Sequence, residues 1–256
     1  MVNDDYTGRI DPEAAEWKDS PWSDLVKERY RICSLFSENK RVLDSCCGTG
    51  WATVSYIANK SLSTVGIDIC EPFKKVLPRA GTFSFIKMDA RDITLEENNF
   101  DLVLALDSIE HFIRQDGLKY LKGLKRVCKE DGLVVGTTPL VPDKDLIGKF
   151  LEWNKYHLHM YTYETLENTL KSVFPAVEIF RIYNRVCPYF LFLCKKTGTD
   201  IPADINDKIK GFLSDHEKNL VNGKRKARFF WAGKLFLKGN LFKAFRFFLA
   251  ATFGTK

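Results

Sequence analysis

The sequence predicts an α/β protein with a Rossmann-like, doubly wound sheet of seven mostly parallel strands that ends in an antiparallel hairpin. Three observations predict it. Short apolar runs alternate with segments of helical spacing, the runs are apolar throughout, and the last two runs follow each other without a helix between them. Strands that are apolar on both faces must be buried on both faces, as in a parallel sheet covered by helices.

The elements are expected in the following order. Helical spacing of Leu25, Arg29 and Ile32 predicts a first helix that ends before Asn39. The first strand, 41–46, leads through a glycine-containing turn into a helix over 51–59. Right-handed crossovers then connect strands at 64–69, 83–88, 100–107 and 132–138, with helices at 72–78 and 115–129. A helix at 162–172 precedes strands 177–183 and 189–195, which pair as a hairpin.

The chain length and composition indicate one globular domain with an appendage. At 256 residues, with 45% hydrophobic and 28% charged residues, the chain excludes a collagen, a coiled coil and a disordered protein. We expect an N-terminal helical lid at 1–40, the sheet domain at 41–197 and a basic, aromatic helical extension at 198–256. No signal peptide or spanning helix is predicted, and the seven scattered cysteines indicate a reducing, cytoplasmic compartment.

The net charge of +6 is concentrated in the C-terminal tail, where lysines and arginines alternate with aromatic residues over 224–253. Two amphipathic helices broken at Gly239-Asn240 would produce this pattern. A helical hairpin packed on the sheet domain or on a second subunit is the favoured interpretation. Peripheral contact with an anionic membrane surface is the next. Single-stranded nucleic acid is the least favoured partner, because the rest of the chain is nearly neutral.

Small and acidic residues follow the first three predicted strands, where a doubly wound sheet binds its ligands. The turn Asp44-Ser45-Cys46-Cys47-Gly48-Thr49-Gly50 allows close approach of the backbone to a ligand. Asp68 ends the second strand, where a carboxylate accepts hydrogen bonds from both ribose hydroxyls. Asp89-Ala90 ends the third and suits an adenine ring. The motif G-x-G-x-x-G is absent, which disfavours a nicotinamide-dependent dehydrogenase.

With these features, the stretch 42–195 resembles the class I S-adenosylmethionine-dependent methyltransferases, and this resemblance covers well over half of the chain. It implies that S-adenosylmethionine is the cofactor. By resemblance, its methionine part contacts Asp44, Cys46, Gly48 and Gly50, its ribose is held by Asp68 and Ile69, and its adenine by Asp89 and Ala90. Ser45 and Asp107 belong to the same expected site, and Cys46 replaces a glycine of the family.

The reacting end is expected after the fourth strand, where Asp107, Glu110 and His111 fall on one face of a helical turn. The segment 154–162, which contains His157 and His159, is expected to open the following helix and to face the same pocket. Methyl transfer from a sulfonium is an in-line displacement, so the acceptor must be positioned, and an alcohol must lose its proton. Asp107, His111 and His157 are therefore the candidate catalytic residues.

These two segments resemble two groups of enzymes. One comprises methyltransferases of surface-polysaccharide and sugar pathways, and the other comprises metal-dependent 2′-O-methyltransferases of small RNA 3′ ends. The second resemblance implies a divalent cation, such as manganese or magnesium, bound by Asp107, Glu110, His111 and His157. Mixed carboxylate and imidazole ligands suit manganese, iron or zinc better than magnesium. The alternative is a metal-free site in which His111 or His157 is the general base.

The expected function is therefore an O-methyltransferase that modifies a sugar hydroxyl of a glycan or nucleotide-sugar intermediate, in the cytoplasm or at the inner membrane face. Its partner would be a small-molecule or glycan substrate. Methylation of an RNA ribose or of a quinone-type phenol is one alternative. A catalytically silent methyltransferase fold that serves as a binding protein is another.

Overall fold

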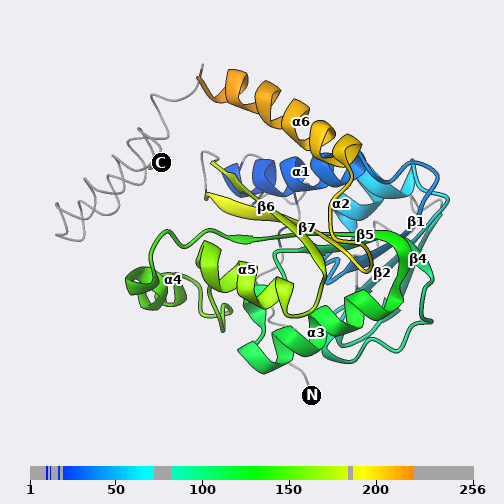
Figure 1. Ribbon diagram of the computed structural model, residues 1–256, viewed down its shortest axis with the longest axis horizontal. Helices are drawn as coiled ribbons and strands as arrows, with labels where there is room; N and C mark the ends of the chain where they lie inside the picture. The colour runs from blue at the N-terminus through cyan, green and yellow to red at the C-terminus, as the bar shows by residue number, and fades with distance from the viewer. Residues whose placement is uncertain are drawn as a thin grey trace.

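The computed structural model describes residues 10, 12, 17, 20–71, 82–183 and 187–221. Its seven-stranded sheet has the order β3-β2-β1-β4-β5-β7-β6 (Figure 1). Strands β1 to β5 pair in parallel, and β7 runs antiparallel to both β5 and β6, which confirms the predicted fold class. The strands are β1 Arg41–Ser45, β2 Ser63–Asp68, β3 Phe83–Lys87, β4 Phe100–Leu106, β5 Cys128–Pro139, β6 Ala176–Ile182 and β7 Tyr189–Lys195.

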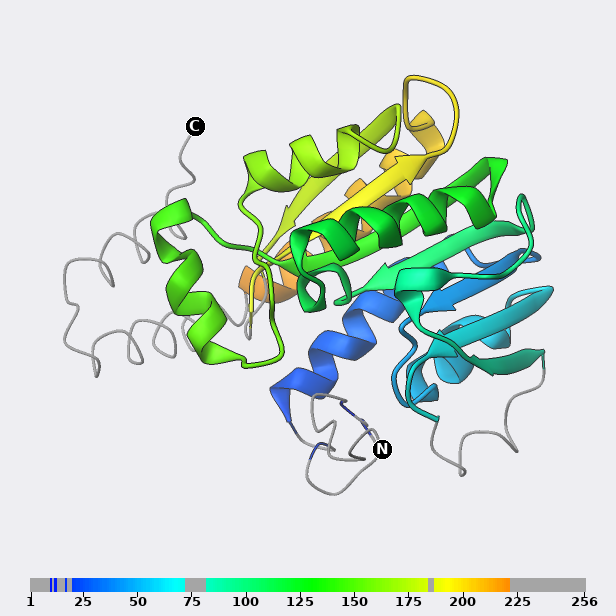
Figure 2. The same cartoon turned by 90° about the horizontal axis from the view of Figure 1, so that it is seen from below.

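Helices cover both faces of the sheet. In Figure 1, α1, α2 and α6 lie on one face of the sheet and α3 and α5 on the other, while α4 lies beyond the end of the sheet. Figure 2 shows α3 and α5 in front of the sheet. The α-helices are α1 Pro21–Ser34, α2 Trp51–Thr53, α3 Arg114–Val127, α4 Ile147–Trp153, α5 Tyr163–Lys171 and α6 Ala203–Val221. Shorter turns are the π-helical η1 Val54–Ala58 and the 3-10 helices η3 Ala90–Asp92, η4 Ile109–His111 and η5 Lys144–Leu146.

Two hydrophobic cores result, one on each face. Successive residues of a strand point to opposite faces, so β4 sends Leu102 and Leu104 to the α1 side and Val103 and Ala105 to the α3 side. All four are buried. This double burial is the reason that the central strand is apolar at nearly every position.

Local sequence signals explain where the helices next to the site begin. Ser20 caps α1 by accepting a hydrogen bond from the Trp22 N–H, and Pro21 occupies the first helical position, where a missing N–H has no cost. At α5, Thr162 and Thr165 form a reciprocal capping box. Both helices thus begin at fixed residues beside the carboxyl end of the sheet.

The structure differs from the sequence prediction in a few elements. The single helix expected over 51–59 consists of α2 followed by a π-helical turn, and β5 begins at Cys128 rather than at residue 132. Helix α4 was not predicted, because its seven residues are too few for a clear period; its Phe150 packs against Val141 and Met160. The predicted helix 72–78 and the tail helices over 224–253 lie outside the described residues.

The division into three parts at residues 40 and 197 stays a prediction. Helix α1 packs on the sheet through Leu25 and Ile32, and the first half of α6 packs on it through Ile209. Within the part of the chain that the structure describes, no helix combines the length and the apolar character needed to cross a bilayer.

Candidate active site

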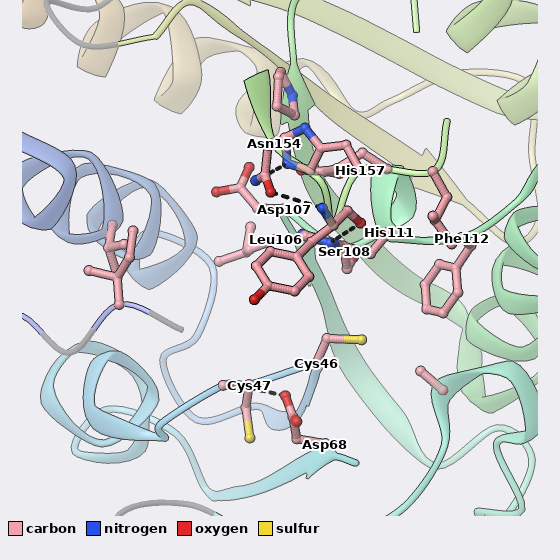
Figure 3. Close-up of a pocket in the computed structure, with 18 of the residues that line it drawn as sticks. Cys46, Cys47, Asp68, Leu106, Asp107, Ser108, His111, Phe112, Asn154 and His157 are labelled. Carbon is pink, nitrogen blue, oxygen red and sulfur yellow. Dashed lines mark hydrogen bonds between the residues drawn. The ribbon is translucent and has the colours of Figure 1, made fainter. Parts of the chain in front are cut away.

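A cavity of about 1260 Å³ opens at the carboxyl ends of the strands. The strand order reverses between β1 and β4, so the turns that follow these two strands border a crevice. Pockets for a single small ligand usually measure about 300–1,000 Å³. This cavity therefore has room for a cofactor and an acceptor together. In Figure 3, Cys46 and Asp68 lie on one side of the pocket and His111 and His157 on the other.

The turn after β1 requires unusual backbone conformations. Cys46, Gly48 and Gly50 have φ angles of 61°, 61° and 74°. Glycine adopts this left-handed region without a steric penalty, whereas Cys46 does not, so the replacement of the family's glycine stores some strain. A Cβ atom at Gly48 would meet no atom within 4 Å, and Gly48 lines the cavity. The turn thus leaves open space where a ligand can approach the backbone.

Asp44 lies beneath this turn and does not line the cavity. The Tyr30 hydroxyl and the Thr53 hydroxyl donate hydrogen bonds to its Oδ2, at 2.9 and 2.5 Å. Burial raises the pKa of the Asp44 carboxyl to about 7, although both hydrogen bonds favour the ionised form. Ser45, whose hydroxyl contacts that of Tyr120, and Gly50 also lie outside the cavity lining. These three predicted cofactor residues therefore do not face the cavity.

The ends of β2 and β3 border the cavity, as the sequence predicts. The Asp68 carboxylate accepts hydrogen bonds from the Gly48 N–H at 2.9 Å and the Cys70 N–H at 3.0 Å, and Ile69 is exposed beside it. Each oxygen of this carboxylate keeps another lone pair for a ligand. The fit is consistent with a ribose site.

Asp89 and Ala90 line the same cavity. Asp89 caps the turn η3 and forms an ion pair with Arg91 at 2.6 Å. Hydrogen bonds from Arg91 hold the pKa of this carboxyl below its usual value. Sequence reasoning missed Arg91, which also approaches Asp116 to 3.8 Å. Both line the cavity.

At the reacting end, Glu110 is fully buried. The Thr138 hydroxyl donates to its Oε2 at 2.9 Å, while Oε1 has no hydrogen-bond partner among the described residues. Burial raises the pKa of this carboxyl, and His111 opposes that effect. The Glu110 carbonyl accepts hydrogen bonds from the N–H groups of Leu158 and His159, at 2.8 and 3.1 Å. These bonds attach the segment 154–162 to the turn after β4, as expected.

The two histidines of the cavity have defined orientations. His111 Nδ1 lies 3.0 Å from the Tyr156 carbonyl, so it carries the proton and leaves the Nε2 lone pair available. The Asn154 amide nitrogen lies 2.9 Å from His157 Nε2, and the Asn154 amide oxygen accepts from the Tyr156 N–H. Neutral His157 is therefore protonated on Nδ1. Burial, together with His111 and Arg29, lowers the pKa of His157 to about 4.

Three of the four expected metal ligands come together. One ligand atom each of Glu110, His111 and His157 lies within 4.8 Å of the others, and the two imidazole rings are 5.0 Å apart. Asp107 is not in this group. Its carboxylate pairs with the guanidinium of Arg29 and accepts a hydrogen bond from the Thr137 hydroxyl at 3.1 Å. Arg29 thus holds Asp107 away from the expected fourth ligand position.

Arg29 was not predicted as a site residue. It is 5% exposed, lines the cavity and stacks on the Tyr189 ring, with 4.7 Å between the guanidinium carbon and the ring centre. The available signal was a charged residue in helical register with Leu25 and Ile32 on the buried face of α1. Such a charge is rarely buried without a partner.

Comparison with known proteins shows similarity to methyltransferases. Residues 43–136 match the model of a family described as a methyltransferase domain. This segment is therefore similar to a methyltransferase domain. The matched segment contains all the predicted cofactor contacts, from Asp44 to Asp107. The open space beside Gly48 and the carboxylate of Asp68 fit S-adenosylmethionine, the expected cofactor.

Two curated relatives are methyltransferases. The chain is 29% identical over 147 residues, 54% of its length, to an uncharacterized methyltransferase of Synechocystis sp.. It is 29% identical over 127 residues, 44% of its length, to the chloroplastic tocopherol O-methyltransferase of Arabidopsis thaliana. The chain spans 65% of the first relative and 36% of the second.

A solved structure shares this fold. The 1,6-didemethyltoxoflavin-N1-methyltransferase of Burkholderia thailandensis, with bound 1,6-didemethyltoxoflavin and S-adenosylhomocysteine, matches with a TM-score of 0.58 and 19% identity. The match covers 72% of this chain and 83% of that protein. At this identity the likeness shows the fold and not the acceptor.

Proposed function

We propose that the protein is an S-adenosylmethionine-dependent O-methyltransferase that transfers a methyl group to a hydroxyl of a sugar in glycan or nucleotide-sugar biosynthesis. One observation supports it most: the cavity beside the glycine-containing turn also contains the cluster Glu110, His111 and His157. This cluster offers a carboxylate oxygen and imidazole nitrogens, which are the groups that orient and deprotonate an alcohol.

S-adenosylmethionine supplies an electrophilic methyl group on its sulfonium. Asp68 would hold the ribose, and Asp89 and Ala90 the adenine, while the turn at Gly48 gives the methionine part room. Helix α1 would close the pocket, because Trp22, Val26 and Arg29 all line it. Exclusion of water strengthens the electrostatic interactions within the site.

His111 is the general base that the geometry favours. Its Nδ1–H donates to the Tyr156 carbonyl, which fixes the ring and leaves Nε2 to accept the proton of the acceptor hydroxyl. Glu110 lies next to it and would stabilise the imidazolium that forms, in the way a buried carboxylate supports a catalytic histidine. His157, neutral because its pKa is about 4, would donate a hydrogen bond from its Nδ1–H without charging.

The same three residues fit a divalent cation, such as manganese. The orphaned Oε1 of buried Glu110 and the short separations in the cluster support this. A bound cation would lower the pKa of a coordinated hydroxyl and would coordinate a neighbouring oxygen of the acceptor. Glu110 Oε1 and His111 Nε2 would hold it, His157 would join them once Nε2 is released from the Asn154 amide, and Asp107 would remain with Arg29.

A quinone-type phenol is the second candidate acceptor. It is favoured by the relative that is a tocopherol O-methyltransferase, at 29% identity over 44% of this chain. A phenol is more acidic than a sugar hydroxyl, so it needs less help from a general base.

The test is transfer of a labelled methyl group from S-adenosylmethionine to a panel of nucleotide sugars and substituted phenols. His111→Ala and His157→Ala should each lower kcat by about 100-fold or more if they assist proton removal. His159→Ala is the matched control, because His159 lies in the same segment but its ring packs on Tyr161 outside the cavity lining. Full activity of both cavity variants would exclude this site.

The same assay separates the remaining alternatives. Loss of activity with EDTA and recovery with manganese would establish the cation, and undiminished activity without metal would exclude it. Binding of S-adenosylhomocysteine without transfer to any acceptor would indicate a catalytically silent binding protein.

A further inference from the structure

Four large apolar side chains surround the mouth of the cavity and remain exposed. Trp22, Ile113, Trp153 and Leu158 are 42%, 51%, 41% and 54% exposed, and all four line the cavity. They come from α1, the start of α3, α4 and the segment before α5. We call these four residues the apolar rim. Their convergence from four elements on one opening is unlike the scattered apolar residues of an ordinary surface.

The apolar surface continues inward from the rim. Phe112 and Phe150 line the same cavity, and Phe150 lies against Trp153 with 4.7 Å between ring centres. The polar cluster is deeper: Glu110 has no exposed surface, and His111 and His157 are only partly exposed. The cavity thus changes from apolar at its mouth to polar at its inner end.

Charge at the mouth does not select an ionic ligand. On α4, Lys149 and Glu152 both line the cavity and offer opposite signs. The cavity volume of about 1260 Å³ also exceeds that needed for a single ligand. A ligand that extends from the cluster to the mouth would lie against these apolar side chains, where its apolar surface would be removed from water.

We propose that the methyl acceptor is amphiphilic: a hydroxyl-bearing ring reaches Glu110, His111 and His157, and an apolar chain or ring system attached to it lies on the apolar rim. This inference rests on the proposed function and specifies its substrate class. The rim recognises the apolar part by contact area, and the cluster recognises the hydroxyl by hydrogen bonds. Either sugar or phenol meets the second requirement. The first narrows the proposed function to acceptors that carry an apolar group and makes a free nucleotide sugar the poorer acceptor.

The experiment measures binding of n-alkyl β-D-glucosides, from butyl to nonyl, each below its critical micelle concentration. The full-length protein is saturated with S-adenosylhomocysteine, and binding is measured by calorimetry. Burial of each methylene group should tighten the dissociation constant by at most about fourfold. The expected result is a steady gain in affinity with chain length.

Variants assign that gain to the rim. Trp22→Ala and Trp153→Ala should each reduce the gain per methylene. Leu62→Ala is the matched control, because Leu62 is 64% exposed but does not line the cavity, and it should leave the gain unchanged. His111→Ala should weaken all members of the series by the same factor and keep the gain, because it contacts the head group only.

An affinity that does not depend on chain length, or a gain that persists in the Trp22→Ala/Trp153→Ala double variant, would overturn the proposal. Loss of phosphatidylglycerol vesicle binding in the double variant, with no chain-length dependence in solution, would make the rim a membrane contact instead and would also overturn it. Failure of the proposed function is separate: either S-adenosylhomocysteine would fail to bind, or no methyl group would be transferred to any acceptor, whatever the glucosides do.

Discussion

At the scale of single residues, the site depends on charges that are held out of water. Asp44 is buried beneath the turn after β1, with the Tyr30 and Thr53 hydroxyls on one of its oxygens and no partner for the other among the described residues. Its carboxyl pKa of about 7 means that folding favours the protonated form. The folded state therefore binds an extra proton between pH 4 and 7, and stability from this group declines as the pH rises through that range.

Asp44→Asn should remove this pH dependence. The amide keeps the shape of the protonated carboxyl and cannot ionise. At pH 8 the free energy of unfolding of the variant should therefore exceed that of the wild type by a few kcal/mol at most. This difference should shrink towards pH 5, where the wild-type carboxyl is protonated in the folded state. Urea unfolding at both pH values measures it. A difference that is constant with pH would contradict the raised pKa.

The ion pair between Arg29 and Asp107 leads to an asymmetric prediction. The Arg29 side chain is 6% exposed and that of Asp107 is 29% exposed, so removal of Asp107 takes the ion-pair partner from the more deeply buried charge and leaves only the fields of Glu28 and Glu110. Asp107→Asn should therefore lower the free energy of unfolding more than Arg29→Met does. For Arg29→Met we expect a loss of about 2 kcal/mol, because water reaches the Asp107 carboxylate that remains. Urea unfolding of both variants tests the order, and the reverse order would show that Arg29 has another counter-charge.

At the scale of the elements, close contact between β5 and β7 shapes the sheet beside the site. Gly136 of β5 pairs with Phe192 of β7, and a Cβ atom there would lie 2.0 Å from the Phe192 ring. Thr137 and Thr138 follow directly, and their hydroxyls donate to Asp107 and Glu110. The absence of a side chain at Gly136 thus allows β5 and β7 to lie close together, and β5 then places the hydroxyls of Thr137 and Thr138 at the reacting end.

Gly136→Ala should lower the free energy of unfolding by about 3 kcal/mol or more, because the ring, surrounded by other core residues, has little room to move. Gly148→Ala is its control: a Cβ atom there meets nothing within 4 Å, and the residue lies in α4. Alanine should be neutral or stabilise by at most about 1 kcal/mol there. Thermal unfolding of the two variants is the measurement, and equal effects would contradict the packing argument.

At the scale of the whole molecule, one cavity joins parts that are distant in the chain. Helix α1, the turns after β1 and β4, and the segment from α4 to His157 all contribute to its lining. A ligand that fills the cavity contacts all of these parts and binds only the folded chain, so its binding free energy adds to the stability of the fold.

S-adenosylhomocysteine should therefore raise the melting temperature. At about a hundredfold excess over its dissociation constant it should add about 2.7 kcal/mol, which corresponds to a shift of roughly 5–10 °C for a domain of this size. Asp68→Ala should reduce the shift at a fixed ligand concentration, because a ribose contact is lost. Absence of any shift at millimolar ligand would remove the basis of the proposed function.

The sequence alone determined the fold class and the location of the crevice. Fully apolar runs such as that of β4 require burial on both faces, and the residues that end parallel strands, such as Asp68 and Asp89, must meet at one edge of the sheet. Both conclusions follow from local patterns, because a few consecutive residues are enough to show that a strand is buried and where it ends.

Only the tertiary structure decided which charged side chains meet. The sequence predicted that Glu110, His111 and His157 share a pocket, but only the structure paired Asp107 with Arg29 of α1 and placed four exposed apolar residues around one opening. These pairings join segments separated by tens of residues, and each depends on how helices pack on the sheet. Because that packing is set by the whole core and not by any one segment, no local pattern in the chain specifies it.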